Sequence, residues 1–301
     1  MSRILLSLLI LLSIIPVVTS CSAIGNKIAV IPLNGVIEPG PGGSLLGGSS
    51  ITPDAVRKEL EKVKDDSMFK AIVIQVNSPG GDVSACEEIA YEMAKVKKPI
   101  VISMRSVAAS GGYYISAKAD KIVALQSTLT GSIGVISEMP NLNGLLDKVG
   151  VKMEVIKSGK YKDMYSGFAD LTPEERALVQ KTTDQMYDQF IDVVAEGRHL
   201  DKEKVRELAT GQIYTGLEAK QLGLVDELGG IQTAIDLAAK LADVQNPVTE
   251  YIYPQSPSLI DILLNGSGSQ LINTMLGGLS GAEQMAASTF LNNTYPRFLF
   301  R

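Results

Sequence analysis

The segment Ser106-Val-Ala-Ala-Ser-Gly-Gly-Tyr-Tyr-Ile115 follows an apolar run from Pro99 to Met104. The run predicts a buried strand, and the small and apolar residues from Tyr113 to Ala119 predict one or two helical turns. Ser110 therefore lies at a strand-to-helix turn, followed by two glycines that let the backbone approach a ligand closely. A helix N-terminus also presents free N–H groups to negative charge. Ser110 is a candidate nucleophile; the alternative is that it only caps a helix.

Outward from this turn, apolar strands alternate with helices. Strands are predicted at Lys27–Leu33, Ala71–Val76 and Lys121–Leu125, and helices at Thr52–Lys64 and Val83–Lys97. This alternation is typical of βαβ units and predicts an α/β fold with a mostly parallel sheet. Because right-handed crossovers place the loops after successive strands at one edge, the Gly80-Gly81 loop and the Ser110 turn are expected to be neighbours.

The second half of the chain is predicted to be mainly helical. Thr172 and Glu175 form a capping box for a long helix that runs to about Glu196, and a further helix covers Asp201–Ala209. An apparent strand, Met153–Ile156, precedes these elements. No repeat or low-complexity linker divides the body, so residues 25–250 are expected to form one domain.

Composition excludes several classes of function. The net charge is −5 and no basic patch dominates, which argues against nucleic acid as a partner. One His and two Cys are too few for a His and Cys zinc site. The His, His199, follows a helical pattern and is a poor candidate for a catalytic base. Lys is the natural remaining base for a serine nucleophile, if burial lowers its pKa.

Three stretches could supply the rest of a catalytic site. Backbone N–H groups of the Gly80-Gly81 loop could stabilise an oxyanion; the alternative is an ordinary tight turn. Residues 128–135, Thr-Leu-Thr-Gly-Ser-Ile-Gly-Val, could line the same cavity or form a bulged strand. Lys157, Lys160 and Lys162 lie close together, and the residues alone do not choose a base among them.

The two ends differ from the body. Residues 1–24 contain an apolar run after Arg3 and are expected to be a signal peptide or a membrane anchor. Val18-Thr-Ser-Cys21 resembles a lipobox, which makes Cys21 a candidate lipidation site; the alternative is an uncleaved anchor. Either places the body on the extracytoplasmic side of the membrane. Residues 251–301 are interpreted as a tail for oligomer or membrane contacts.

Four motifs together resemble the signal peptide peptidase SppA family in its single-domain form. They are Asn77-Ser-Pro-Gly-Gly-Asp-Val83, Ala108-Ala-Ser-Gly-Gly-Tyr-Tyr114, Leu129-Thr-Gly-Ser-Ile-Gly-Val135 and Ser158-Gly-Lys-Tyr-Lys-Asp163, and the similarity covers roughly residues 27–245. The resemblance implies a ClpP/crotonase-like fold: repeated ββα/βαβ units with a mostly parallel sheet, plus helical C-terminal elements.

The resemblance also implies roles for individual residues. Ser110 matches the nucleophile and Lys162 the base of a Ser–Lys dyad. Ser132 matches a hydroxyl that holds the Lys amine, and Gly81 and Gly111 match the oxyanion donors. Neither a metal nor a cofactor is implied.

By resemblance, the chain is a membrane-associated serine endopeptidase that degrades released signal peptides and other short apolar peptides through an acyl-enzyme. The family's homo-oligomeric rings or domes imply a similar assembly, with active sites that neighbouring subunits can complete. Three alternatives stay open: a coenzyme A enzyme of the crotonase group, a catalytically silent scaffold, and a protease specific for one membrane protein.

Overall fold

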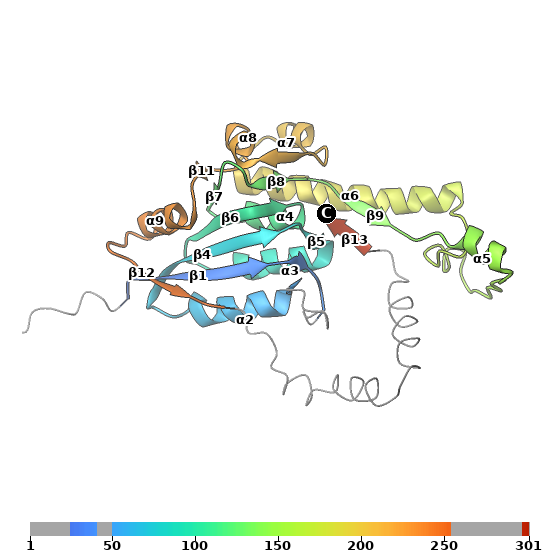
Figure 1. Cartoon of the computed structure of the whole chain (residues 1–301), viewed down its shortest axis with the longest axis horizontal. Helices are drawn as coiled ribbons and strands as arrows, with labels where there is room; N and C mark the ends of the chain where they lie inside the picture. The colour runs from blue at the N-terminus through green and yellow to red at the C-terminus, as the bar shows by residue number, and fades with distance from the viewer. Residues whose placement is uncertain (1–24, 41–49, 254–296, 301) are drawn as a thin grey trace, which may run out of the picture.

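The computed structural model describes residues 25–40, 50–253 and 297–300 (Figure 1). Its main sheet is parallel except at one edge, where β10 runs antiparallel to β8. In spatial order its strands are β10 (Ile213–Thr215), β8 (Leu129–Gly131), β6 (Ile100–Ala109), β4 (Phe69–Ser78), β1 (Lys27–Asn34) and β12 (Val248–Tyr251). Beside the first half of β6 lies β7 (Lys121–Ala124), which pairs with β11 (Glu227–Leu228). The predicted α/β class with a mostly parallel sheet is confirmed.

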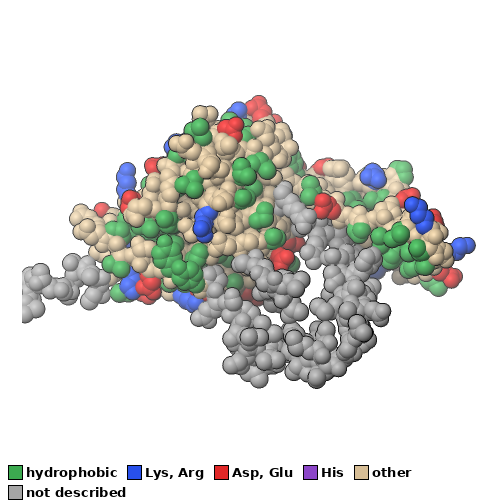
Figure 2. Space-filling view, viewed as in Figure 1, with side chains coloured by type: hydrophobic (Ala, Val, Ile, Leu, Met, Phe, Trp, Pro, Cys, Tyr) green, Lys and Arg blue, Asp and Glu red, His purple; other side chains and the backbone are tan. Residues whose placement is uncertain are grey.

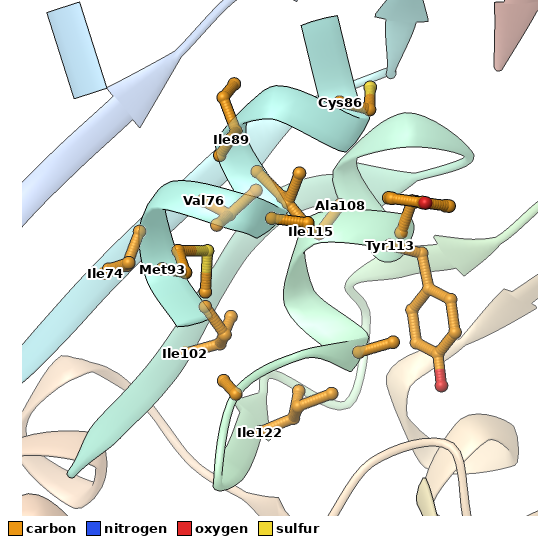
Figure 3. Packing of buried hydrophobic residues seen from close by; sticks show 14 of the residues in the cluster. Ile74, Val76, Cys86, Ile89, Met93, Ile102, Ala108, Tyr113, Ile115 and Ile122 are labelled. Atoms are coloured by element: carbon orange, nitrogen blue, oxygen red, sulfur yellow. The ribbon is translucent and has the colours of Figure 1, made fainter. Parts of the chain in front are cut away.

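The central strands form the core because both of their faces are covered. Ile72 and Ile74 of β4 pack on one face, toward the helices that precede and follow the strand. Ala71 and Val73 pack on the other face, against α9 (Ile231–Leu241). Strands that are buried on both faces are typical of parallel sheets and explain the continuous apolar runs in the sequence. Figure 3 shows the first of these layers, with Ile74, Val76, Cys86 and Ile115 converging.

The helices follow the predicted positions closely. α2 (Pro53–Lys64) begins after Thr52, and α3 (Val83–Ala94) ends three residues before its predicted end. α6 (Pro173–Arg198) begins with the predicted capping box of Thr172 and Glu175. The remaining helices are α4 (Gly111–Ala117), α5 (Asn143–Val149), α7 (Lys202–Leu208) and α8 (Gly216–Gln221).

Residues 139–171, here called the arm, project away from the sheet beside the N-terminal end of α6 (Figure 1). Helix α5 in the arm has no buried residue. Apolar side chains in the arm are exposed, including Leu145, Val149, Met153 and Ile156, the last at 95%. Figure 2 shows hydrophobic side chains gathered at this end of the molecule.

The strand predicted at Met153–Ile156 is wrong. These residues have no regular secondary structure and are exposed. A strand needs a neighbour for its backbone N–H and C=O groups, and the arm offers none within the part of one copy that the structure describes.

A small second sheet lies beside the end of β6. In spatial order its strands are β3 (Ser50–Ile51), β2 (Val36–Ile37), β5 (Gly81–Asp82), β13 (Arg297–Phe300) and β9 (Ile136–Glu138). The chain therefore ends next to the predicted oxyanion loop, and Figure 1 marks the C-terminus there. Of the tail predicted at 251–301, residues 254–296 and 301 lie outside the described residues.

The predicted N-terminal anchor also lies outside the described residues, as does Cys21. Among the helices that the structure does describe, none has the length and hydropathy needed to cross a membrane.

Candidate active site

Ser110 lies at the junction of β6 and α4, in a strained backbone conformation. Its φ is 54° and its ψ is −118°, and such a conformation in a non-glycine residue costs about 1–3 kcal/mol. Two hydrogen bonds hold it: the Ser110 N–H donates to the Gly131 carbonyl at 2.8 Å, and the Tyr114 N–H donates to the Ser110 carbonyl at 2.8 Å. Strain maintained in this way is typical of functional positions.

The Ser110 hydroxyl has no structural partner. The side chain is completely buried, and its Oγ makes no hydrogen bond within the described part of the chain. It does not cap α4, so the capping interpretation is wrong. A buried hydroxyl without a partner is costly, and its placement here indicates that a substrate or another group completes its hydrogen bonding.

The tyrosines after Ser110 fix the position of α4. The Tyr113 hydroxyl is buried and donates to the Leu224 carbonyl at 2.9 Å. Burial raises the pKa of Tyr113 well above its usual value, which keeps this hydroxyl protonated as a donor. The Tyr114 ring meets the Phe190 ring of α6 edge-on, with centroids 5.2 Å apart. The turn that carries Ser110 is therefore held by the core on both sides.

Gly81 and Gly111 lie side by side, as the topology predicted. A Cβ built on Gly111 would be 3.1 Å from the Gly81 backbone nitrogen and 3.2 Å from the Gly80 Cα. The loop is fixed from outside by the Ile37 N–H, which donates to the Gly80 carbonyl at 2.9 Å. The backbones of Gly80, Gly81 and Gly111 therefore lie in contact, next to Ser110.

A residue that the sequence analysis missed supports this loop. Ser78 is fully buried, and its Oγ accepts a hydrogen bond from the Gly80 N–H at 3.1 Å. The local signal was present, because a serine two residues before a turn glycine often forms such a side-chain turn. Asp82 was also missed as the cap of α3: its carboxylate accepts from the Ala85 N–H at 2.9 Å.

Cys86 packs directly against Gly111, the residue after Ser110. Its Sγ would lie 2.6 Å from a Cβ on Gly111, so residue 111 has no room for a side chain. Burial raises the pKa of the Cys86 thiol well above its usual value, and the charge of Asp82 adds to the effect. Cys86 is thus a fully buried part of the apolar core (Figure 3).

Cys86 is therefore expected to resist alkylation in the folded protein, because the thiolate is the reactive form and burial disfavours it. The measurement is mass spectrometry of the Cys86 peptide after iodoacetamide treatment, with and without denaturant. Rapid labelling of the native protein would show that this packing opens in solution.

Ser132 follows β8 on the same side of the molecule. It has a φ of 49° and is 7% exposed, and its N–H donates to the Gln212 carbonyl at 2.8 Å. The Thr130 hydroxyl donates to the Ala108 carbonyl at 2.7 Å, which ties β8 to the end of β6. The strand that precedes Ser132 is thus paired with the end of β6, the strand that precedes Ser110.

The three lysines of the arm differ in their partners. The Lys157 amine pairs with Asp163, and this hydrogen bond lowers the pKa of the Asp163 carboxyl. The Lys160 amine pairs with Glu174, which raises the pKa of Lys160. Lys162 is exposed, and no ion pair with a described residue engages its amine. Of the three amines, the Lys162 amine is therefore the one that no described carboxylate holds.

Within one copy, however, Lys162 does not reach Ser110. The lysine lies on the projecting arm, whereas Ser110 is buried at the start of α4 (Figure 1). The Ser110 hydroxyl has no hydrogen bond to it. The structure thus brings Ser110, Gly81 and Gly111 together and leaves the predicted base outside.

The structure also shows where His199 and Asp163 lie. His199 ends α6 in the left-handed conformation, with a φ of 54°. Asp163 pairs with Lys157, as described above. No group of His, Cys, Asp and Glu side chains in the described residues is suited to hold a metal ion.

Two models of known protein families match this chain. The family model described as peptidase family S49 matches residues 92–245, and the model described as Clp protease matches residues 51–130. The Clp match agrees with the α/β architecture and with the predicted ClpP-like fold.

Three relatives align with most of the chain. A protein of Enterococcus faecium whose assigned name is signal peptide peptidase SppA is 42% identical over 72% of this chain and 64% of its own length. A Synechocystis protein named as a protease is 39% identical over 92% of this chain and 96% of its own length. Protease 4 of Haemophilus influenzae is 36% identical over 82% of this chain and 42% of its own length. The chain thus spans less than two thirds of the first and third relatives and nearly all of the second.

Proposed function

Because the chain belongs to peptidase family S49, a family of serine peptidases, we propose that it hydrolyses peptide bonds with Ser110 as nucleophile and Lys162 as general base. The single observation that carries this assignment is the buried Ser110 hydroxyl, which makes no hydrogen bond to a described residue and lies on a strained turn beside two glycine backbones.

The proposed reaction is acyl transfer. Neutral Lys162 accepts the Ser110 proton while Oγ attacks the carbonyl carbon of the scissile bond. The backbone N–H groups of Gly81 and Gly111 stabilise the tetrahedral oxyanion. The amine product leaves with the proton from Lys162, and water activated by the same lysine hydrolyses the acyl-enzyme. In this scheme Ser132 holds the Lys162 amine in place.

The site is proposed to be completed by a second copy of the chain. Two observations support this: the Ser110 hydroxyl has no hydrogen-bond partner among the described residues, and the arm exposes both Lys162 and a set of apolar side chains. An arm that docks on the next copy makes a heterologous contact, and such contacts generate a ring when the rotation closes. The Clp protease match is consistent with a ring of this kind.

The substrates are proposed to be released signal peptides and other short apolar peptides at a membrane surface. One relative carries the name signal peptide peptidase. In this proposal residues 1–24 anchor the chain, with the body on the extracytoplasmic side and Cys21 as the lipidation site. Mass spectrometry of the mature N-terminus tests the anchor: a lipidated Cys21 supports it, and an unmodified chain starting at Met1 contradicts lipidation.

Labelling with a fluorophosphonate probe tests the nucleophile. The wild-type chain and Ser106→Ala are expected to be labelled, and Ser110→Ala is not. Ser106 is the matched control because it lies on β6, four residues before Ser110, and is exposed. Equal labelling of Ser110→Ala would exclude Ser110 as the activated serine.

Replacing Gly81 with alanine is expected to lower kcat by about 10²–10³-fold, the cost of losing one oxyanion donor. The physical reason is steric: a Cβ at residue 81 would lie 2.0 Å from the Ile37 carbonyl oxygen, so the loop and its N–H must move. Steady-state kinetics on a fluorogenic peptide measure the effect. The control is Gly134→Ala, whose Cβ would lie 3.6 Å from its nearest neighbour. Equal kinetics of Gly81→Ala and wild type would remove Gly81 from the oxyanion site.

A further inference from the structure

The loop that carries Lys162 lies in the arm and contains no helix or strand. Residues 158–166 consist of turns and bends. Backbone hydrogen bonds close single turns within this loop; for example, the Lys162 N–H donates to the Gly159 carbonyl at 3.3 Å. Ordering one residue of such a loop costs about 1–2 kcal/mol of conformational entropy. Contacts from side chains must therefore help to hold it in one conformation.

Glu174 supplies such contacts from outside the loop. It lies in the first turn of α6, which runs beside the arm (Figure 1). One carboxylate oxygen of Glu174 accepts a hydrogen bond from the Tyr161 hydroxyl, and the other pairs with the Lys160 amine. Both donors directly precede Lys162 in the chain. A single carboxylate on a regular helix thus holds the two residues before the proposed base.

A second contact holds the loop on the other side of Lys162. The Lys157 amine pairs with the Asp163 carboxylate at 2.5 Å and donates to the Lys160 carbonyl at 3.1 Å. The residues on both sides of Lys162 are therefore tied, whereas no described carboxylate holds the Lys162 amine itself. This combination fixes the backbone of the loop and leaves the amine available.

We propose that Glu174 is a positioning residue, which holds Lys162 in place for catalysis by clamping Lys160 and Tyr161 to the start of α6. The inference rests on the proposed function for the role of Lys162, but the clamp itself needs no catalysis. Hydrogen bonds from Lys160 and Tyr161 lower the pKa of the Glu174 carboxyl, so at neutral pH it is ionised and accepts from both. Positioning matters for the rate, because a displacement of about 1 Å can cost 10²-fold.

The clamp has two donors, and this redundancy gives it a signature in mutant kinetics. Lys160→Ala leaves the Tyr161 hydroxyl on Glu174, and Tyr161→Phe leaves the Lys160 amine there, so each variant is expected to keep most of kcat. The double variant Lys160→Ala/Tyr161→Phe and Glu174→Ala both remove the whole clamp. Each of these two is expected to lower kcat about ten-fold with KM little changed, because residues that share one partner have non-additive effects.

Two further variants control for charge and for the helix terminus. Glu174→Gln keeps an amide oxygen that can accept from Tyr161 or Lys160, and it is expected to recover most of kcat. Glu203→Ala is the matched control, because Glu203 is also an exposed glutamate in the first turn of a helix. Its kcat is expected to equal that of the wild type. Steady-state hydrolysis of a fluorogenic peptide by the full-length chain measures all of these effects.

Hydrogen–deuterium exchange tests the clamp without catalysis. In the Ser110→Ala background, Glu174→Ala is expected to speed exchange of the peptide that covers residues 157–166, because the loop opens more often. Exchange in the first turn of α6 is expected to stay the same, since Thr172 and Glu175 still cap it. Glu203→Ala is expected to change neither region.

Unchanged kcat in Glu174→Ala, unchanged exchange of the loop, or no recovery in Glu174→Gln would each overturn the inference. A ten-fold loss in Lys160→Ala alone would also contradict it, because the remaining Tyr161 contact should suffice. If the wild-type chain hydrolyses no peptide while the exchange difference stands, the proposed function fails and with it the catalytic role of Lys162, whereas the clamp on the loop is upheld.

Discussion

Replacing Ser110 with alanine is expected to lower kcat for peptide hydrolysis by about 10⁶-fold, the scale seen when a serine peptidase loses its nucleophile. The substitution removes the only atom that can form the acyl-enzyme in the proposed mechanism. The fold should be unaffected, because the hydroxyl makes no hydrogen bond among the described residues and alanine fits the space. The measurement is steady-state hydrolysis of a fluorogenic apolar peptide, with the unfolding midpoint recorded in parallel.

The control for this prediction is Ser106→Ala, which replaces an exposed serine of β6, the strand that leads into Ser110; this variant should retain full activity. Because the buried Oγ lacks a partner, Ser110→Ala is also expected to be as stable as the wild type or slightly more stable. Peptide hydrolysis in Ser110→Ala at the wild-type rate would remove Ser110 from the mechanism, whatever the labelling shows.

The second large effect is expected at Lys162. Lys162→Ala should lower kcat by about 10³-fold, within the range that a general base contributes. Stability of the single chain should hardly change, because the side chain is exposed on the arm. The measurement is again kcat, together with the rate of fluorophosphonate labelling of Ser110, which falls when the hydroxyl is no longer activated.

Lys160→Ala is the matched control for Lys162→Ala. Lys160 lies two residues away in the same loop, but its amine pairs with Glu174. This exposed ion pair is worth little stability, so Lys160→Ala should keep most of its activity. An inactive Lys160→Ala beside an active Lys162→Ala would reverse the assignment of the base.

Much of the fold could be predicted because its signals are local. The buried strands appear as continuous apolar runs, and the capping box of Thr172 and Glu175 locates the start of α6 within one residue. The order of strands and helices then placed the Gly80-Gly81 loop beside the Ser110 turn, and the structure confirms that contact. Each of these features depends on residues that are close in sequence or on general rules of α/β topology.

The features that sequence reasoning missed depend on distant partners. β2, β3 and β5 are two residues long, too short to show any periodicity. β13 pairs with strands that lie more than half the chain away, so no local pattern could place it beside Gly81. Conversely, residues 153–156 have the composition of a strand but pair with no strand in the described part of the chain.

Only part of the candidate site could be predicted, because the rest depends on residues that are distant in the sequence. The motifs of the family identified Ser110, Gly81, Gly111, Ser132 and Lys162, and the first three come together in the structure. No pattern within one chain shows that Lys162 lies apart from them, on an arm with exposed apolar residues. The family match supports the proposed roles, and their chemical assignment stays a prediction until it is measured.

The most direct test of a Ser110–Lys162 dyad shared between two copies is complementation between two inactive variants. Ser110→Ala and Lys162→Ala chains are co-expressed, purified as mixed assemblies and assayed for peptide hydrolysis. If Ser110 of one copy works with Lys162 of another, mixed contacts contain complete sites, and activity rises well above that of either variant alone. Activity of the mixture no higher than the sum of the two separate variants would contradict a dyad shared between copies.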